Sequence, residues 1–401
     1  MKPKLAVVVT HPIQHFAPIY QRLARNGRIE VVVLFLTDAG SRTYYDKQFG
    51  QSFAWDIDLL SGYRHQFLRP GLDRVPKGFF NADVPEIGKI LDAENPDAVL
   101  VYGYSRRLNW RVRSWVRSRR KRLLYCSDSV LHRKRATWRL WLKTALLPTF
   151  FRGVDVCLAA GDCNAEYFRH YGVPADRIHR CPLPVDVQRL RHAGGAALPA
   201  LREQQRAELQ LRPAHFVVLL CGKLYGIKRP QDLVAAVVRL REQGLPAVGL
   251  FVGSGVLLED LKSQAAASAC PEAFRFTGFV NQSALPAYFA AADALAIPSS
   301  EDAHPLVATE AAVYGLPLVV SDQVGCLGPN DVARAGENAL VHPCGDVAAL
   351  AARLRELLET PTLRQSMGAA SRRIAETQDI SVAAQAIEAA VLYQIKLNYG
   401  R

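Results

Sequence analysis

Short runs of apolar, often β-branched residues alternate with helical segments along the chain, and this alternation constrains the fold more than any other feature. Fully buried strands have this composition, and their alternation with helices is typical of parallel sheets with crossover connections. The alternation occurs in both halves of the 401 residues, so the sequence predicts an α/β protein of two Rossmann-like, doubly wound domains. The predicted strands are 5–10, 30–36, 97–103, 122–128 and 154–161 in the first half and 216–222, 248–255, 274–279, 292–298 and 316–322 in the second.

The boundary between the two domains is predicted from a change in composition. Pro, Gly and polar residues without clear periodicity occupy 183–213. We therefore expect an N-terminal domain over 1–187, a linker region over 188–213 and a C-terminal domain over 214–379. The tail, 380–401, has the apolar spacing of an amphipathic helix, which either finishes the second domain or crosses back onto the first.

Composition and cysteine usage exclude several classes of protein. The most apolar region, 140–151, is interrupted by Lys143 and Pro148 and is far shorter than the ~20 residues that span a bilayer. The first residues include too few apolar side chains for a secretory signal. The eight cysteines occur singly and without metal-ligand spacing, as expected for reduced thiols in a cytoplasmic protein that has no structural metal site.

Positive charge is concentrated in one part of the chain. The net charge is +13, and between Arg106 and Arg152 fifteen Lys and Arg residues accompany one acid, Asp128. An excess of this kind predicts an anionic partner, such as a phosphate group or a lipid head group. A nucleic acid is not expected as the partner, because no recognised nucleic-acid-binding module accompanies the charge.

Two helical segments within this basic region each have an apolar side, and two interpretations of them stay open. In the first, 105–147 lies on an anionic membrane, which makes the protein peripheral at the inner face of the cytoplasmic membrane and suits a lipid-linked acceptor. In the second, both apolar sides pack on the sheet of the first domain. The apolar positions are Leu108, Val112, Trp115 and Val116 in the first segment and Trp138, Trp141, Leu142, Ala145 and Leu146 in the second, at about 137–147.

Ligands of open parallel sheets bind where strands end, so the segments that follow the strands are the first candidates for a site. After 216–222 comes a loop that begins at Gly222 and contains Lys223 and Lys228, and Pro230 then begins a helix. Cations beside the amide groups of a helix start suit a diphosphate. The alternative is a solvated turn with surface lysines.

The segment after 292–298 combines acids with a second helix start. Glu301 and Asp302 follow the strand, and Glu310 lies one turn into the helix. A buried carboxylate needs hydrogen-bond donors, which the hydroxyl groups of a sugar or a ribose would supply. The alternative is an acidic helix cap and a solvated glutamate. The amide groups near His304, Pro305 and Leu306 lie at the helix N-terminus, where they would point at an anion.

The first strand ends differently from that of a dinucleotide-binding protein. His11 and His15 follow 5–10, and the GxGxxG fingerprint is absent from this place in the sequence. The absence argues against a nucleotide-dependent dehydrogenase. Each histidine is either a structural residue or part of a site at the strand end.

Four segments of the second half occur in a fixed order and spacing: GKLYGIKRP, LFVGSGVLLEDL, FTGFVNQSALPAYFAAADALAIPSSEDAHPLVATEAAVYGLPLVVSD and GENALVHPCGDVAALAARLREL. Over about 216–360 they resemble the C-terminal half of the family 4 glycosyltransferases. The segments THPIQHFAPIY and AAGDCNAEYFRHYGVPADRIHRCPLPVD of the first half look like a subgroup of this family, of the bacterial surface-polysaccharide type. The resemblance implies the GT-B fold, in which two Rossmann-like domains face each other across a cleft.

The resemblance also implies an activity. It implies a retaining, metal-independent enzyme that moves a sugar from a nucleotide-sugar donor to a glycan or polyprenyl-diphosphate-linked acceptor, without a cofactor. Lys223 and Lys228 would offset the charge of the leaving diphosphate, together with Gly222 and the amides of 304–306. The alternatives are a non-catalytic module that binds a nucleotide-sugar or a lipid, and a nucleotide-sugar epimerase of the same fold.

The family's paired acids, eight positions apart, fall on Asp302 and Glu310. Glu310 is expected to hold the ribose hydroxyl groups of the donor. Asp302 departs from the usual glutamate, so either Asp302 or Glu301 takes the first position, which contacts the donor sugar. Selection of the base is expected from backbone groups near Phe279 and Val280.

The acceptor-side residues are expected in the N-terminal domain. They are His11, His15 and Asp128. Asp128 stands near the place where many relatives have a histidine, so it is a candidate for a position beside the donor sugar or for holding the acceptor hydroxyl. The catalytic candidates of the whole chain are therefore His15, Asp128, Asp302 and Glu310.

Overall fold

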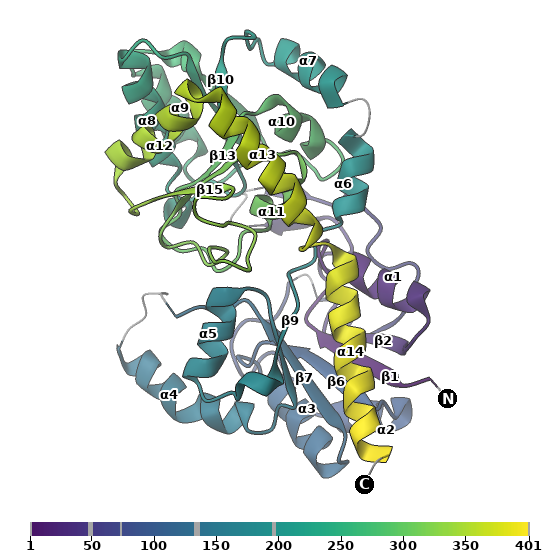
Figure 1. Cartoon of the computed structure of the whole chain (residues 1–401). Helices are drawn as coiled ribbons and strands as arrows, with labels where there is room; N and C mark the ends of the chain where they lie inside the picture. Colours follow the sequence, from purple (N-terminus) through teal and green to yellow (C-terminus); the bar gives the residue numbers. More distant parts are fainter. Residues whose placement is uncertain (1, 47–50, 73, 132–136, 195–197, 400–401) are drawn as a thin grey trace. The chain divides into compact units, whose positions relative to one another are not determined.

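The chain forms two compact units, each built around a parallel sheet (Figure 1). The computed structural model describes residues 2–46, 51–72, 74–131, 137–194 and 198–399. The first unit comprises the residues up to Tyr44, Ile57–Pro184 and those from Ile380 onward. The second unit comprises Tyr45–Asp56 and Val185–Asp379. The chain therefore passes from one unit to the other more than once.

The sheet of the first unit has seven strands among the described residues, in the order β5-β2-β1-β6-β7-β8-β9. Every pairing is parallel. After each strand, a helical or loop crossover returns the chain to the end of the sheet where the strands begin. The strands are β1 (Lys4–Val9), β2 (Glu30–Phe35), β5 (Arg64–Phe67), β6 (Ala98–Tyr102), β7 (Arg122–Ser127), β8 (Val156–Ala159) and β9 (Ile178–Arg180).

Helices cover both faces of this sheet, and successive residues of each strand point to opposite faces. Val7 of β1 packs in one core cluster with α1 and α14, whereas Val8 packs in the other with the remaining helices of the unit. Strands buried on both faces give the continuous apolar runs of the sequence. The helices are α1 (Ala17–Asn26), α2 (Ile87–Glu94), α3 (Arg107–Ser118), α4 (Thr137–Phe151), α5 (Asp162–His170) and α14 (Ile380–Tyr399).

The sheet of the second unit has six parallel strands among the described residues, in the order β12-β11-β10-β13-β14-β15. From β10 the chain first adds β11 and β12 on one side of the sheet and then β13, β14 and β15 on the other. The carboxyl ends of β10 and β13 therefore flank the point at which the strand order reverses, which is called the switch point. The strands are β10 (Phe216–Cys221), β11 (Ala247–Val252), β12 (Phe274–Gly278), β13 (Ala294–Ile297), β14 (Leu318–Ser321) and β15 (Ala339–His342).

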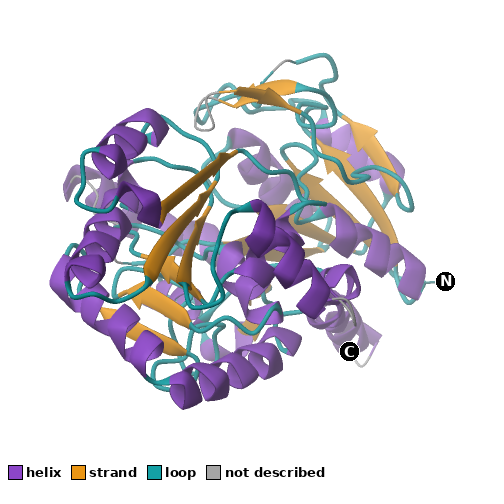
Figure 2. Ribbon diagram, turned by 90° about the horizontal axis from the view of Figure 1, so that it is seen from above, coloured by secondary structure: helices purple, strands orange, loops and turns teal. Residues whose placement is uncertain are grey.

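Helices again enclose the strands (Figure 2). Val217 and Leu219 of β10 pack on one face with α6, α10, α11 and part of α13, and Val218 and Leu220 pack on the other with α8, α9 and α12. The helices are α6 (Val187–Gly194), α7 (Leu198–Glu208), α8 (Pro230–Glu242), α9 (Leu258–Ala266), α10 (Leu285–Ala291), α11 (Leu306–Val313), α12 (Val347–Glu359) and α13 (Pro361–Glu376). The two units thus confirm the predicted class, two Rossmann-like α/β domains.

The sequence analysis missed three strands of the large sheets, β5, β9 and β15. All three are edge strands, which have one neighbour and leave part of their residues exposed. Polar residues therefore interrupt β5 and β9, as in RHQF and IHR, and the apolar run of β15, ALVH, is too short to mark a strand. The ten strands that were predicted all occur, with ends shifted by up to two or three residues.

The region 188–213, predicted as a linker, instead belongs to the second unit and contains α6 and α7. Arginines attach α7 to α10: Arg202 Nη1 donates to the carbonyl of Ala290 at 2.9 Å, and Arg206 Nη1 donates to that of Ala291 at 2.9 Å. Arg206 is almost fully buried. Because charged side chains make these contacts, the apolar periodicity that would reveal the helices is weak.

The apolar sides of the two helices in the basic region differ in burial. In α3, Leu108, Val112, Trp115 and Val116 are buried against the sheet, so this helix packs as a structural element. In α4, Leu147 and Phe150 are buried, whereas Trp141 is 77% exposed. Leu142 and Leu146 are also exposed, and the side chain of Trp138 lies outside the described residues. Within the described part of the chain, no helix has the length and apolarity needed to cross a bilayer.

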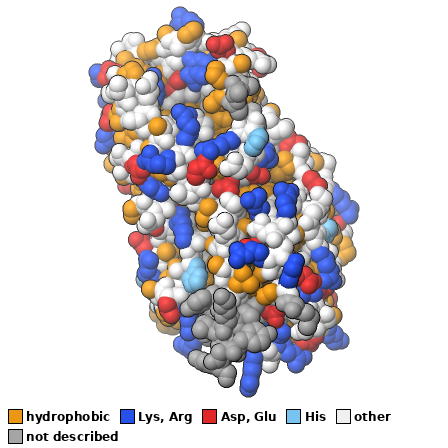
Figure 3. Space-filling view, turned by 45° about the vertical axis from the view of Figure 1, so that its right-hand side comes forward, with side chains coloured by type: hydrophobic (Ala, Val, Ile, Leu, Met, Phe, Trp, Pro, Cys, Tyr) orange, Lys and Arg blue, Asp and Glu red, His pale blue; other side chains and the backbone are white. Residues whose placement is uncertain are grey.

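Acids from other parts of the first unit offset part of the charge of the basic region. Arg111 pairs with Asp83 at 2.7 Å, and Arg119 pairs with Asp92 at 2.8 Å. Figure 3 shows that Lys and Arg side chains are mixed with acids on the face in view, without forming a continuous basic stripe. The ion pairs with Asp83 and Asp92 show that part of the charge of α3 is neutralised within the first unit.

Two glycines allow the loops after β10 and β11 to touch. Gly222 and Gly253 have φ angles of 139° and 140°, a region open only to glycine. The N–H of Gly222 donates to the carbonyl of Val252 at 2.9 Å. A Cβ atom on Gly253 would lie 1.9 Å from the carbonyl oxygen of Gly222, so any side chain would force the loops apart.

We expect Gly253→Ala to lower the free energy of unfolding by at least about 2 kcal/mol, because it adds backbone strain and a clash with the backbone of Gly222. The matched control is Gly226→Ala, at a glycine whose added Cβ would meet no atom within 4 Å. Urea unfolding of both variants measures the difference. Equal losses of stability would contradict the close approach of the two loops.

Candidate functional site

An ion pair joins the loops that follow β10 and β13. Lys228 ends a short 3-10 helix, Gly226–Lys228, and its Nζ donates to Oδ2 of Asp302. Beside this pair, the N–H of Ser300 donates to the carbonyl of Ile227 at 2.8 Å. The structure therefore brings together two predicted site residues from segments that lie more than 70 positions apart in the sequence.

Asp302 is held on its backbone side as well. The N–H of Gly325, in the loop after β14, donates to the carbonyl of Asp302 at 2.8 Å. Of the two neighbouring acids, Glu301 and Asp302, it is Asp302 whose carboxylate contacts Lys228. Lys223 lies in the same β10–α8 loop as Lys228, directly after Gly222, and its side chain is half-buried.

Glu310 lies within α11 with its side chain buried at the carboxyl edge of the sheet. Burial raises the pKa of Glu310 to about 7, because the charged form loses its hydration, and the positive charge of Arg189 opposes this rise. The thiol of Cys221, at the end of β10, is close enough for Glu310 to raise its pKa further after the larger effect of burial. An unliganded Glu310 is thus partly protonated near neutral pH.

The sequence analysis missed Arg189, which lies in α6 and is the charge that stabilises ionised Glu310. It falls in the segment that was predicted as a linker. The spacing of Val187 and Leu190, which are both buried, is the signal that could have predicted a helix here. The charge of Arg189 in this helix acts on Glu310 and Tyr314.

His304, Pro305 and Leu306 form the start of α11, as the sequence predicted, and Pro305 is the N-cap residue. The side chain of His304 has a separate partner: its Nε2 donates to Oδ1 of Asp331 at 3.0 Å. Both side chains are almost fully buried. Asp331 also accepts from the N–H of Val332 at 2.9 Å, so the pair ties the loop after β14 to the start of α11. No sequence pattern marked Asp331, because it stands in an irregular loop.

Phe279 and Val280 follow β12 at the same edge of the sheet, and both are half-buried. The residues after them contact the segment of the first half that belongs to the second unit. Asn281 Nδ2 donates to the carbonyl of Ala54 at 2.8 Å, and the N–H of Ser283 donates to Asp56 at 3.0 Å. The predicted nucleoside region is therefore bordered by residues 54–56, which the sequence did not indicate.

The acceptor-side candidates lie at strand ends of the first unit. His11 follows β1, where burial and, second, the charge of Arg106 lower its pKa to about 4, so its imidazole is neutral at pH 7. Nδ1 of His11 lies 2.8 Å from Oγ1 of Thr10. His15 pairs with Gln14 at 3.1 Å. Asp128 follows β7 with an exposed side chain, and β6 separates β7 from β1 in the sheet.

The second unit has the parts of an anion and hydroxyl site. The loop after β10 provides Lys223 and Lys228, and the start of α11 provides backbone amides with the positive end of a helix dipole. Glu310 provides a carboxylate that lacks full solvation. Such a set can bind a group that carries both phosphate oxygens and hydroxyl donors.

Family models match both halves of the chain. The model described as Glycosyltransferase Family 4 matches residues 14–189, and the model described as Glycosyl transferases group 1 matches residues 202–374. Together they span most of both units.

Curated relatives match part of the chain. A D-inositol 3-phosphate glycosyltransferase of Streptomyces scabiei is 32% identical over 252 residues, which is 59% of this chain and 54% of the relative. A glycogen synthase of Mycobacterium tuberculosis is 34% identical over 156 residues, 39% of this chain and 37% of the relative. The chain thus spans about half the length, or less, of these relatives.

Solved structures match nearly the whole chain in fold. Alr3699/HepE of Anabaena, in complex with UDP, is 17% identical with a TM-score of 0.71, covering 96% of this chain and 98% of its own. Sucrose-phosphate synthase of Thermosynechococcus elongatus is 18% identical with a TM-score of 0.71, covering 99% and 100%. With the two family models, these similarities show that the chain belongs to the family 4 glycosyltransferases and has their GT-B fold.

Proposed function

We propose that this protein transfers a sugar from a nucleotide-sugar to a glycan or lipid-linked acceptor, with retention of anomeric configuration and without a metal ion. The observation that carries the proposal is the Lys228–Asp302 pair beside the start of α11, with Glu310 one turn further along the helix. The names of the relatives support sugar transfer, and the structural neighbour bound to UDP supports a nucleotide as the donor's carrier.

The leaving diphosphate is the group whose charge the site must offset. Lys228 is already held in place by Asp302, so it would meet a phosphate oxygen without losing much side-chain freedom. Lys223 and the backbone N–H groups of His304 and Leu306, on either side of Pro305, would supply further donors. Because cations and amides would neutralise the developing charge, the proposed reaction needs no metal ion.

Glu310 would hold the ribose of the nucleotide. Two neighbouring hydroxyl groups donate well to one carboxylate, and they would replace the hydration that Glu310 lacks. Asp302 is the residue proposed to contact the donor sugar, with Glu301 as its neighbour. Phe279 and Val280 would border the base with backbone groups.

On the acceptor side, His11, His15 and Asp128 are proposed to bind the hydroxyl group that attacks. His11 is neutral at pH 7, so it would act through a hydrogen bond and not through charge. Asp128 is exposed and acidic within a basic segment, which suits a group that accepts the proton of a hydroxyl.

We also propose that the protein works at the inner face of the cytoplasmic membrane, with α4 as the part that contacts lipid. Trp141, Leu142 and Leu146 are exposed on one side of this helix. Arg152, just after the helix, is exposed as well. Tryptophan and leucine beside a cation are typical of a surface that lies in the head-group region of an anionic membrane. The buried apolar side of α3 has no part in this proposal.

We expect Lys228→Ala to lower turnover by about 10²–10³, the effect of removing one strong contact to a developing anion. Turnover is measured as release of nucleotide from the nucleotide-sugar that most raises the melting temperature in a screen of UDP, GDP and ADP sugars. Lys262→Ala is the matched control, because Lys262 is an exposed lysine that also pairs with an acid. Wild-type kinetics in Lys228→Ala, or no nucleotide that shifts melting, would contradict the proposal.

We expect nucleotide binding to weaken about tenfold between pH 8 and pH 6. Ribose hydroxyl groups favour the ionised carboxylate, but the pKa of unliganded Glu310 is about 7, above its ordinary value, so at pH 6 binding must first remove a proton. Titration calorimetry with UDP measures the pH dependence, and Glu310→Gln corrects for the titration of UDP itself. A wild-type profile as flat as that of Glu310→Gln would exclude Glu310 as the ribose ligand.

We expect the variant Trp141→Ser/Leu142→Ser to lose about nine-tenths of its binding to vesicles that contain anionic lipid, because it removes apolar area that would enter the bilayer. Its melting temperature should not change, since both side chains are exposed. Val256→Ser, at an apolar residue 70% exposed in the second unit, is the control. If the wild-type protein does not sediment with anionic vesicles, the membrane proposal is wrong.

A further inference from the structure

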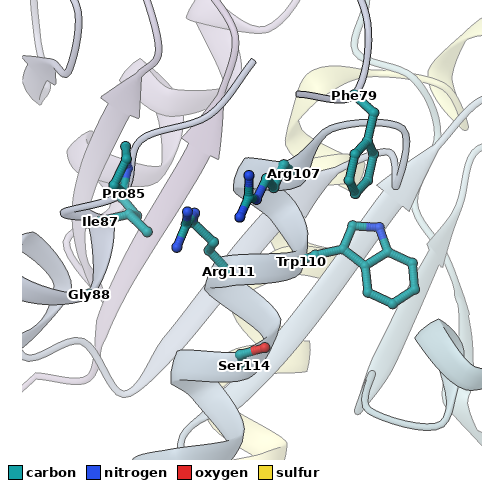
Figure 4. Close-up of a pocket in the computed structure, with 8 residues that line it drawn as sticks. All are labelled: Phe79, Pro85, Ile87, Gly88, Arg107, Trp110, Arg111 and Ser114. Carbon is teal, nitrogen blue, oxygen red and sulfur yellow. The ribbon is translucent and has the colours of Figure 1, made fainter. Parts of the chain in front are cut away.

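A groove of ≈ 480 Å³ lies along α3 in the first unit (Figure 4). Its volume falls within the range of about 300–1,000 Å³ that is usual for small-molecule sites. One wall is formed by the first turn of α2 and by Pro85, two residues before this helix, and the other includes the loop that contains Phe79. The lining residues are Phe79, Pro85, Ile87, Gly88, Arg107, Trp110, Arg111 and Ser114.

The groove side of α3 is a stripe of helical spacing. Arg107, Trp110, Arg111 and Ser114 stand at positions i, i+3, i+4 and i+7, so they share one side of the helix. The opposite side is buried against the sheet and fixes the rotation of the helix. In Figure 4 the two arginines point into the space between α3 and Pro85, while Phe79 and Trp110 lie together on the other side of Arg107.

Asp83 holds both guanidinium groups in place. Nε of Arg111 lies 2.7 Å from one carboxylate oxygen of Asp83, and Nε of Arg107 lies 3.5 Å from the other. Among the described residues these are the polar contacts of the two guanidinium groups, which leaves their Nη edges for a ligand. Fixed, planar pairs of N–H donors recognise paired oxygen atoms with little loss of side-chain entropy.

Acids offset most of the positive charge around the groove. The hydrogen bond to Asp83 and, to a smaller extent, the charge of the exposed Glu86 raise the pKa of Arg111. Arg69 adds a third positive charge nearby, because its Nη1 donates to the carbonyl of Asp83 at 3.5 Å. Three arginines and two acids leave a small net charge, which by itself does not select the ligand. Directional hydrogen bonds would decide what binds, together with the aromatic rings of Phe79 and Trp110. Trp110 is fixed by a hydrogen bond from Nε1 to the carbonyl of Tyr104 at 2.9 Å and by its ring contact with Phe150.

We propose that this groove binds a sugar ring of the acceptor chain, at a distance from the bond that is formed. A sugar ring has one face of C–H groups, which suits the negative face of an aromatic ring, and an edge of vicinal hydroxyl groups, which suits the paired donors of a guanidinium. Arg107 begins α3 five positions after the last residue of β6, so the groove starts at the carboxyl edge of the sheet that carries His11 and Asp128. The inference rests on the proposed function in naming the acceptor as the source of the sugar.

The test is saturation-transfer-difference NMR on the full chain with UDP present to occupy the donor site. The probes are the methyl glycosides of glucose, galactose, mannose, N-acetylglucosamine and glucuronic acid. We expect at least one of them to receive saturation from the wild-type protein, and its affinity to fall about tenfold in Phe79→Ala and in Arg111→Gln. Val256→Ala and Arg117→Gln are the controls, because both residues are exposed and outside the groove.

Three outcomes would overturn the sugar site: no saturation of any probe by the wild-type protein, equal signals in all four variants, or loss of binding to anionic vesicles in Arg111→Gln while sugar binding is unchanged. The last outcome would assign the groove to a lipid phosphate. The thermal shift caused by UDP is recorded for the same samples. If UDP gives no shift although a sugar binds in the groove, the donor proposal fails and the sugar site stands.

Discussion

Parallel strands deliver all their carboxyl ends to one edge of a sheet, and every candidate residue of this chain depends on that constraint. In the second unit, segments that start after β10, β12, β13 and β14 meet at this edge although they are spread over more than 100 positions. Glycine at 222 and 253 lets the loops after β10 and β11 approach to backbone contact. The Lys228–Asp302 pair can form only because β10 and β13 are neighbours in the sheet.

The ionisable side chains at this edge of the sheet are partly shielded from water, which disfavours their charged forms. Burial holds Glu310 partly protonated near neutral pH, and the distant charge of Arg189 offsets only part of the lost hydration. Lys228 avoids the same difficulty by pairing with Asp302. A ligand that supplies both phosphate oxygens and hydroxyl donors would satisfy these groups together, which is a physical reason for the site to prefer a nucleotide over a simple anion.

The sequence predicted the elements whose signal is local. Continuous apolar runs marked the inner strands, and the order of the motifs after them indicated the family. It did not reveal the edge strands β5 and β9, because residues such as Arg64 and His179 give them a polar pattern, or the edge strand β15, because its apolar run is too short. It also missed α7, where Arg202 and Arg206 bind backbone carbonyls in place of apolar packing, and the pairing of His304 with Asp331. Contacts of this kind join residues far apart in the chain, and no spacing rule describes them.

The last helix closes the first unit, and this order of assembly has a consequence for synthesis. Ile387 and Val391 of α14 fill the core beside β1, and Glu388 accepts a hydrogen bond from Asn26 at 2.9 Å. A ribosome therefore releases all of 185–379 before it supplies the helix that completes the domain begun at the N-terminus. Until then, among the described helices, only α1 covers the side of that sheet on which α14 packs, so a chaperone that shields apolar strands would have its longest period of contact there.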